Sequence, residues 1–231
     1  MIRAVIFDKD GTLFDFRQSW GDWAARLLAD LAGDEAERAR LGAAVGFDTV
    51  ARDFHPDSPV IAGTAAEVAE ALQAALPERP AEDLLARINR AAAAAQMVPA
   101  VPLRPLLEAL RAQGLAIGLA TNDAEAPAEA HLAAHGLRDL FDFVAGYDSG
   151  HGGKPAPGQL LAFAQAVGVS PRDCAMVGDS LHDLEAAQAA GMARVAVLTG
   201  IAKREVLAPH ADVVLADIGG LPAWLAARPA G

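Results

Sequence analysis

The residues best suited to carry chemistry form one short acidic segment, Asp8-Lys9-Asp10-Gly11-Thr12-Leu13. A single residue separates its two aspartates, and two carboxylates this close repel each other unless a cation binds them. Hard oxygen ligands favour Mg²⁺, which takes one or two carboxylates and keeps water or substrate oxygens in its other positions. A carboxylate can also attack phosphorus and form an aspartyl-phosphate. The segment therefore predicts phosphoryl chemistry at a magnesium site, and the alternative is a solvated acidic turn.

Two further segments carry groups that bind phosphate. Thr121 and Asn122 follow the apolar run Ala116–Ala120, and their hydroxyl and amide groups can donate hydrogen bonds to phosphate oxygens without adding charge. Lys154, in Gly152-Gly153-Lys154-Pro155, can bind phosphate and offset clustered carboxylates. Each signal is weak when taken alone, because Thr-Asn after a strand is also a common helix cap and lysines are usually exposed.

A fourth segment, Val177-Gly178-Asp179-Ser180-Leu181-His182-Asp183, again follows an apolar run and opens a predicted helix. Asp179 is placed to share a cation with Asp8, and the N-terminus of the helix favours an anion. Asp183 lies four residues further on and faces the same side of the helix start. The alternative interpretation is a helix-capping arrangement of Asp and Ser.

The elements that must position these residues are short apolar runs that alternate with helical segments. Continuous apolar runs are expected for parallel strands that helices cover on both faces. The predicted strands are Ile2–Phe7, Ala116–Ala120, Phe143–Ala145, Ala175–Val177, Val195–Leu198 and Val213–Leu215. The helical segments between them are Pro105–Gln113, Ala126–His135, Pro157–Val167, Leu181–Ala190 and Lys203–Leu207. This alternation predicts an α/β fold with a doubly wound, mostly parallel, Rossmann-like sheet, in which ligands bind beyond the carboxyl ends of the strands.

One stretch breaks the alternation. From about Phe16 to Gln96 the sequence predicts only helices, separated by prolines and glycines. These helices are expected at Ser19–Leu31, Asp34–Val45, Thr64–Leu76 and Ala81–Met97. We therefore expect an inserted, all-helical cap subdomain over residues 16–97 (the cap), and an α/β core domain made of residues 1–15 and 98–231 (the core).

Composition limits the partners of the chain. The 231 residues carry a formal net charge of −11, which repels phosphate backbones and anionic lipid surfaces, so no nucleic acid and no membrane is an expected partner. The one cysteine, Cys174, cannot form an internal disulfide, and no signal peptide or membrane-spanning run is recognisable. We expect a cytoplasmic monomer or homodimer that acts on a small molecule.

In this order and with these spacings, the four segments resemble the haloacid dehalogenase superfamily, in particular its phosphoglycolate-phosphatase-like branch with a small helical cap. The resemblance covers nearly the whole chain and is most specific over residues 154–191, KPAPGQLLAFAQAVGVSPRDCAMVGDSLHDLEAAQAAG. Dehalogenases of the superfamily lack the second aspartate of the first segment, so the presence of Asp10 disfavours carbon–halogen chemistry.

The resemblance implies a role for each polar residue of the four segments. Asp8 would be the nucleophile and Asp10 the general acid/base. Mg²⁺ would be held by the carboxylates of Asp8 and Asp179 and by the backbone carbonyl of Asp10. Asp183 would orient Lys154 or a metal-bound water, and the cap would close over the substrate. The phosphate-site residues would be Thr121, Asn122 and Lys154.

The expected function is that of a Mg²⁺-dependent phosphatase that hydrolyses a small phosphorylated metabolite, phosphoglycolate-like or a sugar phosphate, through an aspartyl-phosphate intermediate. One alternative is a phosphomutase resembling β-phosphoglucomutase, and another is a non-catalytic protein that binds phosphorylated metabolites. The sequence departs from the usual family pattern at Lys9, where an aliphatic residue is common, and at Phe16, where a small polar residue is common. These departures leave the substrate open.

Other conspicuous side chains have plainer interpretations. His131 and His135 lie four apart on a predicted helix without further metal ligands, so we expect them to be solvated or packed. His151 and His182 flank the motifs and are candidates for a place near the site, and Cys174 is expected in the core of the fold. The cap contains possible anion contacts that are more often solvated surface residues, namely Arg17, Arg52, His55 and Arg87.

Overall fold

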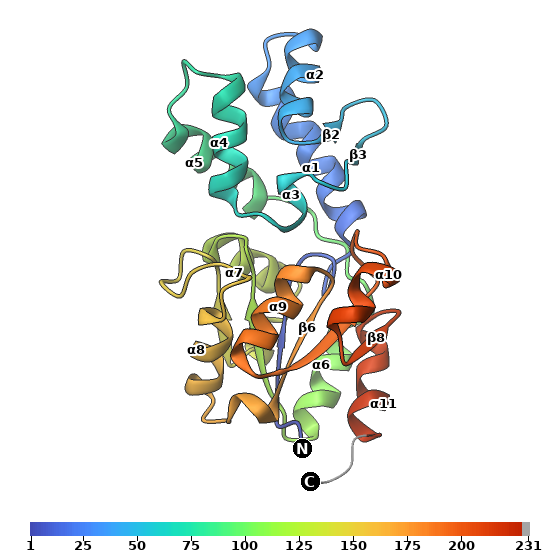
Figure 1. Ribbon diagram of the computed structural model, residues 1–231. Coiled ribbons are helices and arrows are strands. Elements are labelled where there is room, and N and C mark those ends of the chain that lie inside the picture. Colours follow the sequence, from blue (N-terminus) through green and yellow to red (C-terminus); the bar gives the residue numbers. More distant parts are fainter. Residues whose placement is uncertain (228–231) are drawn as a thin grey trace.

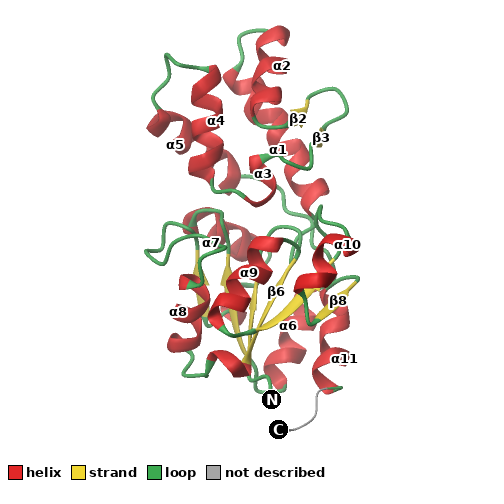
Figure 2. Cartoon of the chain, viewed as in Figure 1, coloured by secondary structure: helices red, strands yellow, loops and turns green. Residues whose placement is uncertain are grey.

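A computed structural model describes residues 1–227 of the chain, so the last four residues of the expected core domain lie outside the described part. Its centre is a six-stranded sheet in the order β5-β4-β1-β6-β7-β8, and every neighbouring pair is parallel (Figure 2). The strands are β1 (Ala4–Phe7), β4 (Ala116–Ala120), β5 (Phe143–Ala145), β6 (Cys174–Gly178), β7 (Ala193–Val197) and β8 (Val213–Leu215). The predicted parallel α/β sheet is therefore confirmed, and each predicted strand is present within two residues of its expected bounds.

Helices cover both faces of this sheet, because alternate residues of each buried strand point to opposite sides. Val5 and Phe7 belong to the cluster that packs against α6 (Leu103–Ala112), α7 (Glu125–Ala134) and α11 (Leu221–Ala226). Ala4 and Ile6 belong to the cluster that packs against α8 and α9. The helices of this second face and its edge are α8 (Gly158–Ala166), α9 (Leu181–Ala190) and α10 (Arg204–Leu207). The sheet is doubly wound, as predicted.

The remaining helices gather beyond the carboxyl ends of the strands (Figure 1). They are α1 (Phe16–Leu31), α2 (Glu35–Ala44), α3 (Pro59–Ala62), α4 (Ala65–Ala75) and α5 (Ala81–Ala93). Short 3₁₀ turns elsewhere span Arg138–Leu140, Pro171–Asp173, Ala208–His210 and Ile218–Gly220. We propose that residues 16–97 form the cap and that residues 1–15 and 98–231 form the core.

The expectation of an all-helical cap is wrong in one detail. A two-stranded antiparallel hairpin, β2 (Phe47–Asp48) and β3 (Asp53–Phe54), lies between α2 and α3. The rings of Phe47 and Phe54 face each other with centroids 4.9 Å apart, and both side chains are buried. Strands of two residues are too short to produce an alternating pattern, so the sequence gives no periodic signal for them.

Two chain segments connect the cap to the core, and they run side by side. The backbone N–H of Asp15 donates to the carbonyl of Val98 at 2.8 Å, and Ala100 donates to Leu13 at 2.9 Å. The N–H of Val98 also donates to the hydroxyl of Ser19 at 3.0 Å, while the Asp15 side chain caps the start of α1. These bonds fix where the cap leaves the core.

None of the helices in the described part of the chain combines the length and the apolar character that a membrane crossing requires.

Candidate active site

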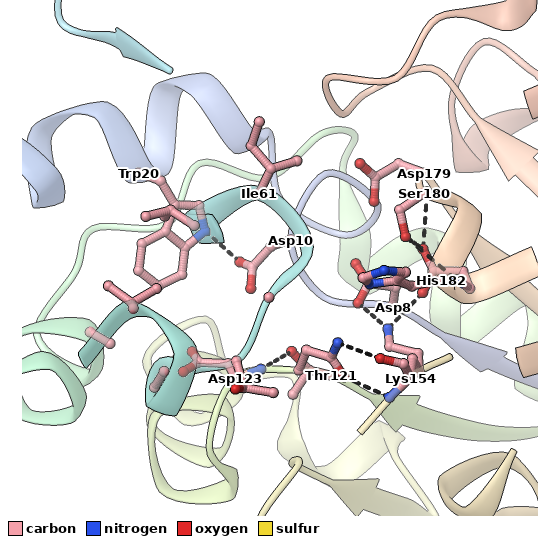
Figure 3. Close-up of a pocket in the computed structure, with 18 of the residues that line it drawn as sticks. Asp8, Asp10, Trp20, Ile61, Thr121, Asp123, Lys154, Asp179, Ser180 and His182 are labelled. Carbon is pink, nitrogen blue, oxygen red and sulfur yellow. Dashed lines mark hydrogen bonds and ion pairs between the residues drawn. The ribbon is translucent and has the colours of Figure 1, made fainter. Parts of the chain in front are cut away.

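The candidate site lies where three neighbouring strands end. β1 pairs in register with β4 on one side and with β6 on the other. The segments that follow these strands bring Asp8, Thr121 and Asp179 to one pocket (Figure 3). The pocket holds about 640 Å³ of empty space, including its opening to solvent, and both the core and the cap line it. The site thus occupies the position expected for a ligand in a parallel α/β sheet.

Lys154 is the buried cation at the centre of this pocket. Its Nζ donates to Asp8 Oδ1 at 2.5 Å, to Asp183 Oδ1 at 2.7 Å and to the carbonyl of Ala120 at 2.8 Å. Burial alone would lower the pKa of Lys154, but the nearby carboxylates of Asp183 and Asp8 raise it above its usual value. The ammonium group therefore stays charged and uses all three of its donors.

The carboxylates around Lys154 still carry an excess of negative charge. Burial raises the pKa of Asp8 to about 7, against the lowering effect of Lys154. Burial and the charges of Asp8 and Asp183 raise the pKa of Asp179 well above its usual value. One carboxylate oxygen from each of these three aspartates lies within 4.8 Å of the others. Such a group of buried oxygens fits a divalent cation, which would relieve the repulsion.

Two glycines lie directly against the carboxylate of Asp179. A Cβ on Gly11 would come within 2.5 Å of Asp179 Oδ2, and a Cβ on Gly200 would overlap the same carboxylate. Gly11 also has a φ of +82°, which side-chain-bearing residues rarely adopt. The two glycines leave room for the Asp179 carboxylate beside the acidic segment.

Asp183, by contrast, has both oxygens engaged within the protein. Oδ1 accepts from Lys154, and Oδ2 accepts from the Ser180 N–H at 3.0 Å and the Ser180 hydroxyl at 2.7 Å. The bond from the Ser180 N–H, together with the bond from the Asp183 N–H to Ser180 Oγ at 3.4 Å, forms a capping box at the start of α9. This arrangement fits a residue that orients its neighbours, and leaves Asp8 and Asp179 as the better placed metal ligands.

Asp10 is held by two donors on the side of the pocket nearest the cap. Lys9 Nζ lies 2.8 Å from Asp10 Oδ1 and 2.7 Å from Oδ2. Trp20 Nε1, from α1, donates to the same Oδ1 at 2.8 Å (Figure 3). The general acid/base candidate is therefore linked directly to the first cap helix.

Lys9 is the residue whose importance the sequence did not reveal. It is fully buried, and besides Asp10 it lies 3.4 Å from Asp123 Oδ2, 3.2 Å from His131 Nδ1 and 5.1 Å from the centroid of the Trp20 ring. Burial would lower the pKa of Lys9, but the charges of Asp10 and Asp123 raise it above its usual value. Lys9 thus supplies a second buried positive charge. It belongs to the acidic segment but does not line the pocket.

The Lys9 contact also defines the protonation of His131. An ammonium group has only donors, so His131 Nδ1 accepts from Lys9 and the proton lies on Nε2. Nε2 then donates to the carbonyl of Ala92, in the cap, at 2.8 Å. Burial and the Lys9 charge lower the pKa of His131 to about 4. The packed alternative for this histidine is confirmed, and the neutral ring joins core to cap.

Thr121 and Asn122 both line the pocket, as predicted, but they have different surroundings. Thr121 Oγ1 accepts from the backbone of Asp123 at 3.0 Å. The Asn122 amide donates to the carbonyl of Lys154 at 2.9 Å and accepts from its N–H at 2.8 Å. Asn122 therefore fixes the backbone that carries the Lys154 ammonium group.

The cap contributes a set of residues to the pocket that the sequence analysis did not single out. They are Trp20, Trp23, Val60, Ile61, Gly63, Thr64, Ala65, Val68, Ile88 and Ala92. In the sequence they read as the buried stripes of helices, and nothing in the periodicity separates a residue that faces a ligand from one that faces another helix. The possible anion contacts of the cap do not line this pocket; they are Arg17, Arg52, His55 and Arg87.

The other histidines and the cysteine also differ in whether they line the pocket. His182 lines the pocket, whereas His151 does not. His135 packs 4.9 Å from the ring of Phe14, and its ring nitrogens contact backbone carbonyls. Cys174 is buried in the core of the fold as expected, and burial raises the pKa of its thiol to about 11.

Comparisons with known proteins agree with this geometry. A family model described as haloacid dehalogenase-like hydrolase matches residues 2–191. The chain is 35% identical over 229 residues to a protein named phosphoglycolate phosphatase from Rhodospirillum rubrum, covering 97% of this chain and 91% of that one. It is also 35% identical over 221 residues to a phosphoglycolate phosphatase from Chromobacterium violaceum, covering 95% of each. A crystal structure of a predicted phosphoglycolate phosphatase from Haemophilus somnus superposes with a TM-score of 0.69 at 21% identity, covering 97% of this chain and 98% of that chain, which shows the shared fold.

The chain therefore belongs to the haloacid dehalogenase-like hydrolase family, as the four segments predicted. Within that family it is an enzyme, a phosphatase that acts on small phosphorylated substrates.

Proposed function

We propose that this phosphatase is Mg²⁺-dependent and cleaves phosphomonoesters through an aspartyl-phosphate on Asp8. The observation that carries the proposal is the surroundings of Asp8, which directly follows β1. Its Oδ1 lies 2.5 Å from Lys154 Nζ, and its carboxylate lies within 4.8 Å of an oxygen of Asp179. An anionic nucleophile can approach an anionic phosphate only where positive charge offsets the repulsion. Location in the cytoplasm and a monomeric or homodimeric state stay predictions from the sequence.

The metal ligands in this proposal are the carboxylates of Asp8 and Asp179 and the backbone carbonyl of Asp10. When bound, Mg²⁺ would neutralise the buried carboxylates and polarise the phosphoryl oxygens. Lys154 would hold the Asp8 carboxylate and face the transferring phosphoryl group with its charge. Asp183 would keep Lys154 in place, and Thr121 would offer its hydroxyl to a phosphate oxygen.

The proton transfers in this proposal belong to Asp10. Its carboxyl group would protonate the departing alcohol oxygen as the bond from Asp8 to phosphorus forms. In the second half of the reaction the resulting carboxylate would take a proton from the water that attacks the aspartyl-phosphate. Lys9 and Trp20 restrict the rotation of this side chain through the bonds described above, which favours transfer along one direction.

Hydrolysis is a better proposal than the phosphomutase alternative, because a mutase must manage protons on the hydroxyl groups of a bound sugar phosphate. Among the pocket-lining cap residues whose side chains the structure describes, none has a titratable group. Binding without turnover is also a weaker proposal, because Asp10 has no task in a protein that only binds. A cap lining without titratable side chains therefore supports transfer of the phosphoryl group to water rather than to a sugar hydroxyl.

The test is the release of inorganic phosphate by Asp8→Asn, with Asp57→Asn, an exposed cap aspartate, as the matched control. Asn preserves size but is a poor nucleophile, so kcat should fall by about 10,000-fold or more. The control should retain the full rate, and circular dichroism should report the same fold for both. Full activity of Asp8→Asn would refute the nucleophile assignment. EDTA should abolish the activity of the unsubstituted enzyme, and Mg²⁺ should restore it.

A further inference from the structure

We propose that the substrate of this enzyme is a phosphomonoester whose alcohol part is uncharged and largely apolar, rather than one that carries a carboxylate such as phosphoglycolate. The inference rests on the proposed function, because it assumes that the phosphoryl group lies against Asp8 and Lys154. The alcohol part of the substrate would then extend toward the cap, which closes the other side of the pocket.

The cap side of the pocket is almost entirely apolar. The side chains that line it with carbon are those of Trp20, Trp23, Val60, Ile61, Ala65, Val68, Ile88 and Ala92. Trp20 turns its one polar atom to Asp10, so its ring presents carbon to the pocket. Figure 3 shows Ile61 on the opposite side of the pocket from Lys154. This wall matches an apolar group, whose burial is favourable in proportion to its area.

The one hydroxyl group of this wall is already engaged. Thr64 Oγ1 donates to Glu67 Oε2 at 3.0 Å and accepts from the N–H of Glu67 at 3.3 Å. The bond from the Glu67 N–H, together with the bond from the Thr64 N–H to Glu67 Oε2 at 2.6 Å, forms the capping box at the start of α4. A polar substrate would have to compete with the helix cap for this hydroxyl.

The cations of the cap are held away from the pocket. The cap sequence contains arginines but no lysine, and no arginine is among the described residues that line the pocket. Arg52 pairs with Asp22, and Arg87 pairs with Asp83 at 3.1 Å, on exposed surface. The cap therefore offers no positive charge to a second anionic group on the substrate.

Among the described core residues that line the pocket, Lys154 is the one with a fixed positive charge, and His182 is the one histidine. Lys154 uses its three donors on Asp8, Asp183 and Ala120. Lys9 is fully buried and does not line the pocket. Asp10 and Asp123 add negative charge to the lining. A substrate carboxylate placed against the cap wall would thus lose its water without gaining a charged partner among the described cap residues, which is costly.

The experiment compares kcat/KM for three phosphomonoesters in the presence of Mg²⁺. Benzyl phosphate has an apolar alcohol part, glycerol 2-phosphate an uncharged polar one, and 2-phosphoglycolate a charged one. We expect values that fall in this order, with about 100-fold between the first and the last. A value for 2-phosphoglycolate equal to or above that for benzyl phosphate would overturn the inference and leave the proposed phosphatase function intact.

A substitution places a cation on the apolar wall. Ile61→Lys, at a partly exposed position, should raise the ratio of 2-phosphoglycolate to benzyl phosphate turnover by about 10-fold, because the ammonium group can pair with the carboxylate. The matched control is Val50→Lys, at a cap residue that is 90% exposed and outside the pocket, and it should leave the ratio unchanged. An equal ratio in both variants would contradict the placement of the alcohol part against the cap.

A binding measurement separates this inference from the proposed function. Calorimetry with Mg²⁺ compares benzylphosphonate with phosphonoacetate, neither of which can be hydrolysed at a phosphate ester bond. Tighter binding of benzylphosphonate supports the apolar pocket even if no ester is turned over, in which case the proposed function alone fails. Tighter binding of phosphonoacetate overturns the inference.

Discussion

The core and the cap line the candidate active-site pocket with side chains of opposite character, polar on the core side and apolar on the cap side. The core wall is polar throughout and contains carboxylates, a lysine, hydroxyls, an amide and a histidine. Many of these groups bond to one another, as Lys154 does with Asp8 and Asp183. The described cap wall is mainly carbon, and its one hydroxyl, that of Thr64, is bonded to Glu67, while no arginine lines it. This difference supports the proposal that the core binds the phosphoryl group while the cap recognises the alcohol part of the substrate.

Lys9 is the place where the two walls meet. It contacts Asp10 and Asp123 of the core and lies against Trp20 of the cap. Through His131 it also reaches the carbonyl of Ala92 in the cap. Asp10, the proposed general acid/base, therefore contacts a core lysine and a cap tryptophan, and substitutions at Lys9 and Trp20 can test the two contacts separately.

The largest effect is expected from the core wall. Lys154→Met removes a buried charge that holds Asp8, so kcat should fall by about 1,000-fold. Lys203→Met, which changes an exposed lysine, is the matched control and should retain the full rate in a phosphate-release assay. If Lys154→Met keeps its fold by circular dichroism and its rate, the core wall does not act as described.

The next largest effect is expected from substitution of Lys9, where the core wall and the cap wall meet. Lys9→Met leaves the partly buried Asp10 and Asp123 without their cation. Breaking a fully buried pair costs about 3–5 kcal/mol, so we expect a loss of unfolding free energy of up to about this size. The rate should fall by about 10- to 100-fold as Asp10 loses its orientation. Urea denaturation measures the first change and phosphate release the second.

The double variant Lys9→Met/Asp123→Asn distinguishes charge from packing at this place. Removing one of the two carboxylates that lost their cation should recover part of the stability but not the rate, because Asp10 still lacks the Lys9 ammonium group and keeps only Trp20 as a donor. No recovery of stability would show that the methylene chain of Lys9, rather than its charge, is what the junction needs.

The pH dependence of stability tests the link from His131 to the cap. The pKa of His131 is lowered to about 4 in the folded protein and lies near 6.5 in the unfolded chain. The unfolded state therefore binds more protons between these values, and the free energy of unfolding falls as the pH drops from 6.5 toward 4. This contribution is roughly 1–3 kcal/mol.

His131→Gln is the variant that isolates this contribution, because Gln can both accept from Lys9 and donate to Ala92 but does not titrate. The difference in unfolding free energy between His131→Gln and the unsubstituted protein, followed from pH 7 to pH 5 by urea denaturation, should shift in favour of the variant. A constant difference would mean that His131 does not stay neutral in the folded state.

A smaller effect is expected from the tryptophans of the cap. Trp20→Phe removes the N–H that holds Asp10 and keeps an apolar ring, so kcat should fall by about 5-fold while KM for benzyl phosphate changes little. Trp23→Phe is the matched control, because Trp23 Nε1 is buried and has no hydrogen-bond partner among the described residues. Equal kcat values for the two variants would argue against a role of the cap in orienting Asp10.

The smallest effect is expected at the exposed cap arginines. Arg87 pairs with Asp83 one helical turn away and does not line the pocket, and exposed pairs of this kind contribute little. Arg87→Ala should therefore leave KM for every phosphomonoester within about twofold. A specific rise in KM for 2-phosphoglycolate would mean that the cap brings this arginine to the substrate.

The sequence predicts the structure best where local pattern and topology agree. Continuous apolar runs predicted β1, β4 and β6 because strands buried on both faces have few other compositions. Once those strands are neighbours, the residues that follow them must gather at one edge, as Asp8, Thr121 and Asp179 do. The β2–β3 hairpin was missed because two residues cannot show a period.

Lys9 illustrates a different limit. In the sequence it is a charged residue where an aliphatic one is common, and no local pattern tells whether its ammonium group reaches solvent. Only the positions of Asp123 and His131, more than a hundred residues away, provide the buried partners that allow a lysine at this place. A signal did exist, since Lys9, Asp10 and Asp123 are all polar residues next to buried strands, but spacing along the chain does not pair them.

The sequence by itself determined the sheet, the order of its strands along the chain and the acidic, amide and ammonium groups at their ends, because these depend on apolar periodicity and on short motifs. The tertiary structure decided which side chains close the pocket from the cap and what holds Asp10. Those contacts join segments that are distant in sequence, and each depends on how one helix is rotated toward its neighbours. Rotation of a packed helix is fixed by the surfaces it meets, and those surfaces exist only in the folded chain.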